Sequence, residues 1–267
     1  MKTIIKSKKF DEMDLPETIY KYRTWTDPFH KRVITNREVF LAKPTSFEDP
    51  FDCKNSIRYD LMSEEERIAW MAYKLGFEVP DMPANFYLSK AREMYPNSLL
   101  SDNKSILEFQ EEEFKKYDVR MGVLSLTANP MNQEMWQKYS EDFKGVCIGF
   151  DPRIMFKYLG GGSIVEYVPE LPMIYPEPKH DFLYQTHLQV CYKLEKWKFE
   201  EEYRTHKFRN YPLSNEERTV TLPPEAYREI LIGPEMPDHH KAEIRAAIPV
   251  ELAHVKIIEL HAESFNT

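Results

Sequence analysis

Cysteine, glycine and long apolar runs are all scarce in this chain of 267 residues. The three cysteines, Cys53, Cys147 and Cys191, are too few and too far apart for a disulfide framework or a Cys-x-x-Cys metal site. The glycine run at 160–162 matches neither a phosphate loop nor a dinucleotide fingerprint. No apolar run approaches the roughly 20 residues of a membrane-spanning helix, and the opening stretch MKTIIKSKKF lacks the apolar core of a signal peptide. These absences predict a cytoplasmic protein that is not inserted in a membrane.

A surplus of basic residues is missing as well. The formal net charge is −8, whereas a protein that coats duplex nucleic acid is normally basic. We therefore expect no broad binding to duplex nucleic acid, which still leaves room for a local basic cleft. Hydrophobic residues make up 42% of the chain, enough for a large core, so the composition indicates a globular protein.

Apolar periodicity and capping patterns predict strands and helices in mixed order. The expected strands are 18–23, 38–44, 121–127, 145–150, 202–209, 217–222, 227–232 and 254–260. The expected helices are 26–36, 132–143, 180–192 and 238–247, with three more at 63–76, 84–95 and 102–118. Because strands and helices mix without regular βαβ alternation, the fold class is predicted as α+β. We expect a single domain over residues 1–267 with two packed, mainly antiparallel sheets and a helical insertion at 60–118.

Three consecutive glutamates stand out in the stretch EKWKFEEEYRTHKF, residues 195–208. If this stretch is extended, its two-residue period places Glu200, Glu202 and Arg204 on one face. Carboxylates at adjacent same-face positions, roughly 6.6 Å apart, repel each other unless a cation or a reaction uses them. Two interpretations stay open: a solvated strand edge neutralised by Arg204, or a pair of catalytic carboxylates.

Two other expected strands carry groups suited to binding. In YKYR, Arg23 ends the strand and its guanidinium can grip a diphosphate through two hydrogen bonds. In LSLT, Ser125 and Thr127 point the same way, and hydroxyls in apolar surroundings need a partner from a ligand or from the backbone. The competing interpretation is structural: a salt-bridged arginine and internally satisfied hydroxyls.

The order of these groups resembles a known signature. Arg23, then Ser125-Leu126-Thr127, then Glu200-Glu201-Glu202 is similar to the Arg, Ser-Thr-Ser, Glu-x-Glu motifs of ADP-ribosyltransferases, with a departure at Leu126. Separately, YKYR, FEDPFD, MWQKYSEDFKGVCIGFD and WKFEEEYR resemble a widespread bacterial family of domains of unknown function. That second resemblance covers nearly the whole chain and implies no particular activity.

The first resemblance implies an ADP-ribosyltransferase-like fold and NAD as a substrate. Glu202 would then be the catalytic glutamate and Glu200 would orient the acceptor. Arg23 would anchor the diphosphate, and Ser125 and Thr127 would support the ribose and nicotinamide. Breaking the nicotinamide–ribose bond passes through an oxocarbenium-like state, which a carboxylate stabilises electrostatically.

An aromatic wall for the nicotinamide ring would come from Trp136, Tyr139 or Tyr203. The chain is thus predicted to transfer ADP-ribose from NAD or to hydrolyse NAD, as a toxin or phage-defence effector. The acceptor could be a protein, a nucleic acid, a small molecule or water.

Two other functions stay open. One is a metal-dependent nuclease in which Asp52, Glu200 and Glu202 hold the ion, and the other is a non-catalytic module that binds a nucleotide or a protein. No other metal site is expected, because the adjacent His239 and His240 diverge on a helix.

Overall fold

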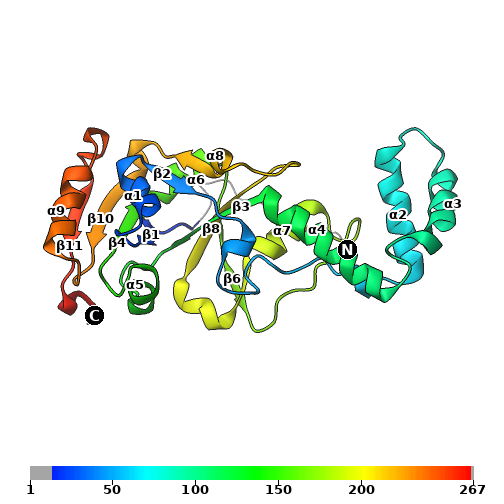
Figure 1. The fold of residues 1–267 in the computed structure, drawn as a ribbon, viewed down its shortest axis with the longest axis horizontal. Helices are drawn as coiled ribbons and strands as arrows, with labels where there is room; N and C mark the ends of the chain where they lie inside the picture. Colours follow the sequence, from blue (N-terminus) through cyan, green and yellow to red (C-terminus); the bar gives the residue numbers. More distant parts are fainter. Residues whose placement is uncertain (1–13, 266–267) are drawn as a thin grey trace.

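A computed structural model describes residues 14–265 of the chain. Its centre is a seven-stranded sheet in the order β11-β10-β4-β1-β3-β8-β5 (Figure 1). The strands are β1 (Ile19–Arg23), β3 (Met121–Thr127), β4 (Val146–Phe150), β5 (Ser163–Ile164), β8 (Glu202–Phe208), β10 (Tyr227–Ile232) and β11 (Lys256–Glu259). All neighbouring pairs are antiparallel except β10 with β11, which is parallel. The α+β class with mainly antiparallel pairing is therefore confirmed.

The strands do not form the two packed sheets that the sequence led us to expect. The large sheet is accompanied only by short ribbons among the described residues. One ribbon pairs β2 (Glu38–Phe40) with β9 (Thr219–Thr221), and the other pairs β6 (Glu166–Val168) with β7 (Tyr192–Leu194). The expectation failed because periodicity assigns strands but does not say which strands are neighbours.

The large sheet is nearly divided between β1 and β3. β1 pairs with β4 over five positions but with β3 only at Tyr20 and Thr127. By contrast, β3 pairs with β8 over seven positions. Since the single shared pair lies near the start of β1 and at the end of β3, the two strands separate toward Arg23. We call this gap the split.

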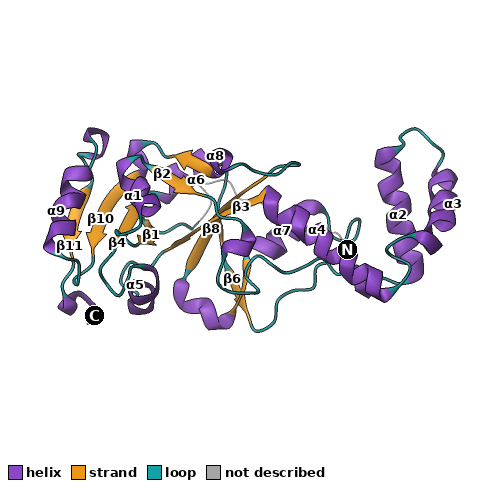
Figure 2. Cartoon of the chain, viewed as in Figure 1, coloured by secondary structure: helices purple, strands orange, loops and turns teal. Residues whose placement is uncertain are grey.

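Helices cover both faces of the sheet (Figure 2). On one face lie α1 (Pro28–Thr35), α6 (Pro152–Leu159) and α9 (Asp238–Ala247), whose Val33, Phe156 and Ile244 join the main apolar core. On the other face α5 (Gln133–Tyr139) packs Met135 and Trp136 against β1 and β4. The remaining helices of the body are α7 (Phe182–Val190) and α8 (Asn215–Arg218).

Three helices form an arm that extends from the body, at the right of Figure 1. They are α2 (Glu64–Glu78), α3 (Ala84–Met94) and α4 (Asn103–Arg120), close to the ranges predicted from the sequence. α2 begins at a capping box in which Ser63 and Glu66 satisfy each other's backbone amides, as the pattern predicted. The arm has its own apolar cluster, and α4 leads back into β3. Within residues 14–265, no helix is both long enough and apolar enough to cross a membrane.

Candidate functional site

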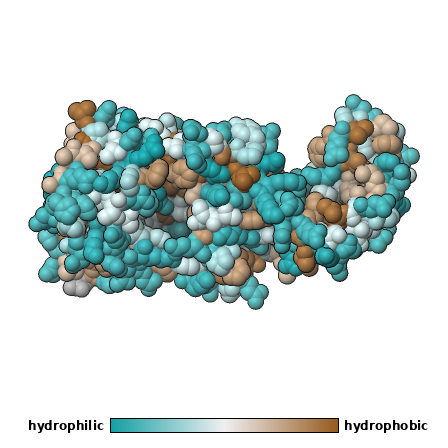
Figure 3. Space-filling model, in the orientation of Figure 1, coloured by the Kyte–Doolittle hydropathy of each residue, from teal (hydrophilic) through white to brown (hydrophobic). Residues whose placement is uncertain are grey.

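A cavity of about 760 Å³ lies at the split. It is lined on one side of the sheet by α1 and β2 and on the other by α5 and residues 46–52. Figure 3 shows a hollow in the surface of the body on the side that faces the viewer. The strand register places Ser125 and Glu202 on the same face of the sheet as Tyr20. Arg23 comes three residues after Tyr20 on β1, so alternation places its side chain on the opposite face. All three residues line the same cavity, and the separation of β1 from β3 explains how they can.

Two cations face the split without a carboxylate partner among the described residues. The Lys21 Nζ atom donates to the backbone carbonyl of Ser125 at 2.6 Å, on the edge of β3 that β1 leaves unpaired. Arg23 donates to the carbonyl of Tyr22 at 3.2 Å. Burial and the neighbouring Arg23 lower the pKa of Lys21 to about 7, and burial lowers the pKa of Arg23 to about 10. Burial thus disfavours the charged forms of both side chains, and an anionic group placed beside them would favour those forms.

The three glutamates do not form one extended strand. Glu200 ends a short 3₁₀ helix (Glu195–Glu200), Glu201 has a φ of 44°, and β8 begins only at Glu202. Glu200 is 1% exposed and Glu202 is 7% exposed. The interpretation as a solvated strand edge is therefore wrong. The 3₁₀ helix and the backbone reversal at Glu201 also correct the assumption that both glutamates lie on one strand face.

Both buried glutamates are held by cations. Glu202 accepts from the Arg204 Nε atom at 2.7 Å, and the Lys193 Nζ atom lies 3.4 Å from its other oxygen. Lys193 also contacts Glu200, which accepts from the Tyr139 hydroxyl at 2.5 Å. Of these side chains, those of Lys193, Tyr139 and Glu202 line the cavity and that of Glu200 does not. Glu200 thus contacts Lys193 from the side away from the cavity.

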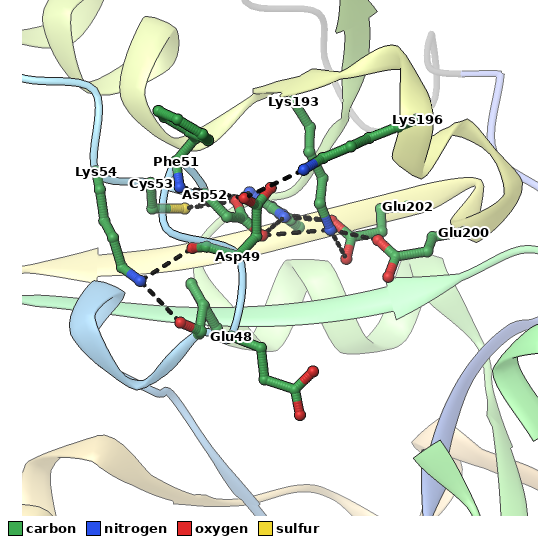
Figure 4. A network of polar contacts seen from close by, with 12 residues as sticks. Glu48, Asp49, Phe51, Asp52, Cys53, Lys54, Lys193, Lys196, Glu200 and Glu202 are labelled. Carbon is green, nitrogen blue, oxygen red and sulfur yellow. Dashed lines mark hydrogen bonds and ion pairs between the residues drawn. The ribbon is translucent and has the colours of Figure 1, made fainter. Parts of the chain in front are cut away.

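Asp52 completes the cluster from the loop after β2. It forms two hydrogen bonds with the Arg204 guanidinium, at 2.7 and 2.8 Å, and lies 3.3 Å from the Lys193 Nζ atom. Figure 4 shows the Lys193 ammonium between Asp52 and the two glutamates. Three carboxylates thus share two cations. Burial and the charge of Glu202 raise the pKa of Glu200, so the excess negative charge is least stable there.

This arrangement is unfavourable for the metal-dependent nuclease. The three carboxylates proposed as ligands do meet, but they meet around an ammonium group. Burial opposes the charge of Lys193, yet Glu202 and Asp52 hold its pKa above the ordinary value, so the ammonium persists. A metal ion would have to displace it. From residue 14 to residue 265, no group of three histidine, cysteine or acidic side chains is placed to hold an ion.

Aromatic rings line the wall beyond Glu202, and two residues of this wall each carry a buried polar atom without a partner in the described chain. Tyr139 and Trp197 line the cavity, with the Lys138 Nζ atom 4.0 Å from the centre of the Trp197 ring. The indole Nε1 of Trp197 and one oxygen of Asp49 are buried and have no hydrogen-bond partner in the described part of the chain. Both residues line this cavity. A buried donor and a buried acceptor without partners favour a ligand that carries both kinds of group.

The structure does not bring Thr127 and Trp136 to the cavity. The Thr127 hydroxyl is fully buried and accepts from the backbone N–H of Asn129 at 3.0 Å. The Trp136 ring belongs to the core under α5, and its N–H donates to the carbonyl of Pro130 at 2.8 Å. Both polar groups have hydrogen-bond partners within the protein, so neither needs a ligand as a partner.

Sequence reasoning missed Lys21, Lys193 and Trp197 as cavity residues. Lys21 could have been found, because it shares a strand face with Arg23 two residues later. Lys193 gave no signal, since a lysine is usually solvated and its partners lie on separate elements.

The site therefore combines an edge with two unpaired basic side chains, Lys21 and Arg23, and a buried carboxylate, Glu202, in one cavity of the described residues. Glu202 is held by Lys193 of β7 and Arg204 of β8. Lys21 and Arg23, on the other side of the cavity, both belong to β1. Comparisons with protein-family models, curated proteins and solved structures find no match to this chain.

Proposed function

We propose that this cavity binds NAD and that the chain cleaves the nicotinamide–ribose bond, passing ADP-ribose to an acceptor or to water. The observation that carries the proposal is the presence of Lys21, Arg23 and Glu202 in one cavity. Its volume of about 760 Å³ lies within the range of small-molecule and cofactor sites.

The diphosphate of NAD fits the cationic edge of the split. Arg23 can donate two parallel hydrogen bonds to phosphate oxygens, and Lys21 adds a point charge from the same strand face. Neither cation forms an ion pair in residues 14–265, so a phosphate would not have to displace a carboxylate. Binding would raise the lowered pKa of Lys21 and fix the proton on its amine.

Glu202 supplies the chemistry in this proposal. The C1′–N bond breaks and its electron pair leaves with nicotinamide, while an acceptor oxygen or water bonds to C1′ and releases its proton. The carboxylate of Glu202 stabilises the positive charge that develops on the ribose. Arg204 and Lys193 hold that carboxylate in place. A preorganised negative group needs no rearrangement when the bond breaks.

The nicotinamide end has a matching pair of groups. A primary carboxamide carries one acceptor oxygen and two donor hydrogens. The unpartnered Trp197 N–H can donate to that oxygen, and the unpartnered oxygen of Asp49 can accept from the amide nitrogen. Tyr139 or Trp197 then provides the aromatic wall.

Glu200 takes a different role from the one suggested by the motif. It does not line the cavity and contacts Lys193 and Tyr139, which do. We therefore propose that Glu200 positions these two side chains and does not contact the acceptor.

The test is incubation of the purified chain with NAD, following nicotinamide release with and without added protein, nucleic acid and small-molecule acceptors. Arg23→Ala should weaken NAD binding by roughly 10- to 100-fold, the loss expected for a charged hydrogen-bond donor. Arg92→Ala is a matched control, since Arg92 is an exposed arginine on the helical arm. The proposal fails if the wild type neither binds nor consumes NAD under any of these conditions.

A further inference from the structure

A second cavity, of about 300 Å³, lies where the arm joins the body. Its walls come from α2 and α4 of the arm and from α7 and the end of β8 in the body. It shares no lining residue with the cavity at the split. The proposed cleavage of NAD makes no use of it.

Two of the residues that line it each carry an unsatisfied polar atom. The Tyr117 hydroxyl and the Arg120 Nε atom are both buried and lack a hydrogen-bond partner within residues 14–265. Burial raises the pKa of Tyr117 well above its ordinary value, so the hydroxyl keeps its proton and can donate it to a ligand. The two residues lie three positions apart on α4 and therefore near each other on the helix surface. Two unsatisfied donors on neighbouring turns of one helix favour a ligand that supplies an acceptor.

The charge of this wall favours an anion. The guanidinium of Arg120 forms no ion pair in the described chain, whereas the other cations of the cavity are paired. Lys74 lies 3.9 Å from Glu177, and Lys116 lies 2.7 Å from Glu113. Arg120 is thus the cation of this cavity whose charge is left for a ligand.

The rest of the wall is largely aromatic. Trp70 comes from α2, Phe114 from α4, Phe182 from α7 and Phe208 from β8. Aromatic rings on several sides favour a flat apolar group. A cavity with hydrogen-bond donors at one end and aromatic rings around the remainder fits a small aromatic acid, whose carboxylate would lie at the donor end.

We propose that the second cavity binds a small aromatic carboxylate, whose oxygens accept hydrogen bonds from Tyr117 and Arg120. The ring lies among Trp70, Phe114 and Phe182. Because α2 supplies one wall and α7 another, the ligand contacts the arm and the body at once.

The experiment uses the full chain with three probes at millimolar concentrations: benzoate, indole-3-acetate and inorganic phosphate. Binding is measured by calorimetry and by the rise in Tm. At least one of the two aromatic acids should bind and raise Tm. Because phosphate can also bind at Lys21 and Arg23, the probes are compared in the Arg23→Ala variant, where phosphate should bind more weakly than the better acid. If neither acid binds, or if phosphate binds that variant as tightly as the better acid, the proposal is overturned.

Three variants locate the site. Tyr117→Phe and Arg120→Gln should each weaken binding by about tenfold or more, the loss of a hydrogen bond to a charged group. Lys115→Gln should leave binding unchanged, because Lys115 is exposed on the same helix and paired with Glu112. Binding that survives both cavity substitutions contradicts the proposed site.

The stability of the unliganded Tyr117→Phe variant gives an independent check. Removing a buried hydroxyl that has no partner should leave Tm equal to or above that of the wild type. A variant that is more stable but binds less well is the result expected of a residue kept for its ligand. A lower Tm without ligand would mean that the hydroxyl already has a partner, and would overturn the argument.

Discussion

Glu202 illustrates how burial changes what a single side chain can do. In water its charge would be screened, but here it is 7% exposed and held by Arg204 and Lys193. The attraction is strong because the surroundings are poorly polarisable, and for the same reason an unpaired member of the cluster would be costly. The residue that we propose for catalysis is thus also part of the structural framework.

Glu202→Gln should reduce NAD cleavage by about 100- to 1000-fold, because the uncharged amide cannot stabilise an oxocarbenium ion. A partly exposed strand residue would tolerate this change at little cost. The buried pairing with Arg204 instead raises the expected loss of unfolding free energy to about 1–3 kcal/mol. Nicotinamide release and thermal unfolding, measured on the same preparation, separate the two effects.

Glu201→Gln is the control, since Glu201 is exposed and its contact is with Asn129. It should match the wild type in both measurements. Wild-type rates in the folded Glu202→Gln protein would show that this carboxylate takes no part in the reaction.

Lys21 gives a pH dependence with a definite sign. Burial and Arg23 lower its pKa to about 7, from an unfolded value near 10.5. Affinity for NAD or pyrophosphate should therefore fall as pH rises through 7, because the free protein loses the proton that the bound phosphate needs. Lys21→Met should flatten the profile between pH 6 and 9, measured by calorimetry. An unchanged profile in this variant would assign the dependence to another group.

The lowered pKa of Lys21 gives the unfolding free energy a pH dependence opposite in sign to that of ligand affinity. Between the folded pKa of about 7 and the unfolded value of 10.5, the unfolded chain holds a proton that the folded chain lacks. The contribution of Lys21 to the unfolding free energy therefore rises with pH across this window and is lowest below pH 7. Lys21→Met should remove that rise in denaturant titrations.

At the scale of elements, the split depends on how little β1 and β3 share. One residue pair joins them, while each is fully paired with its other neighbour. The carbonyl of Ser125, on the open edge, is held by a lysine side chain where a strand would otherwise lie. Backbone groups on an open strand edge are available to a ligand.

Hydrogen exchange should report this opening. The amide of Ser125 should exchange faster than that of Val123, which donates to Ala42 at 2.8 Å. Saturating NAD should slow exchange at Ser125 and leave Gly122 and Leu124 unchanged, since the register places those two on the hydrogen-bonded side toward β8. Equal protection at Ser125 with and without NAD would place the ligand elsewhere.

Many elements could be predicted from sequence because local chemistry decides them. The helix at 238–247 and the strands at 121–127 and 227–232 have the predicted bounds, since alternation or amphipathic period is strong there. Glu200 was misplaced because a local reversal at Glu201 interrupts the strand. The position of Lys193 could not be predicted either, because its three carboxylate partners come from the loop after β2, a 3₁₀ helix and β8.

At the scale of the whole molecule, the arm and the body have separate apolar cores. The arm cluster, which includes Ile68, Ala91 and Ile106, shares no residue with the cores on either face of the sheet. Such regions can lose structure independently. The space-filling view shows apolar side chains gathered on the arm (Figure 3).

Ile68→Ala should destabilise the arm by about 2–5 kcal/mol, because the side chain is 4% exposed and its loss leaves a void. Exchange in α2 and α3 should accelerate while β3 and β8 keep their protection. NAD cleavage should remain at the wild-type rate. Loss of cleavage together with protection in β3 would show that arm and body unfold as one unit.

The central place of β1 also has a consequence for how the chain acquires its structure. β1 is synthesised before its neighbours β3 and β4, which end at Thr127 and Phe150. The buried tyrosines of β1 therefore stay uncovered until the chain as far as Phe150 has left the ribosome. Contacts between such distant segments slow folding and prolong the exposure of apolar surface. Cells that produce this chain quickly should accumulate aggregates, and slower translation or an available chaperone should reduce them.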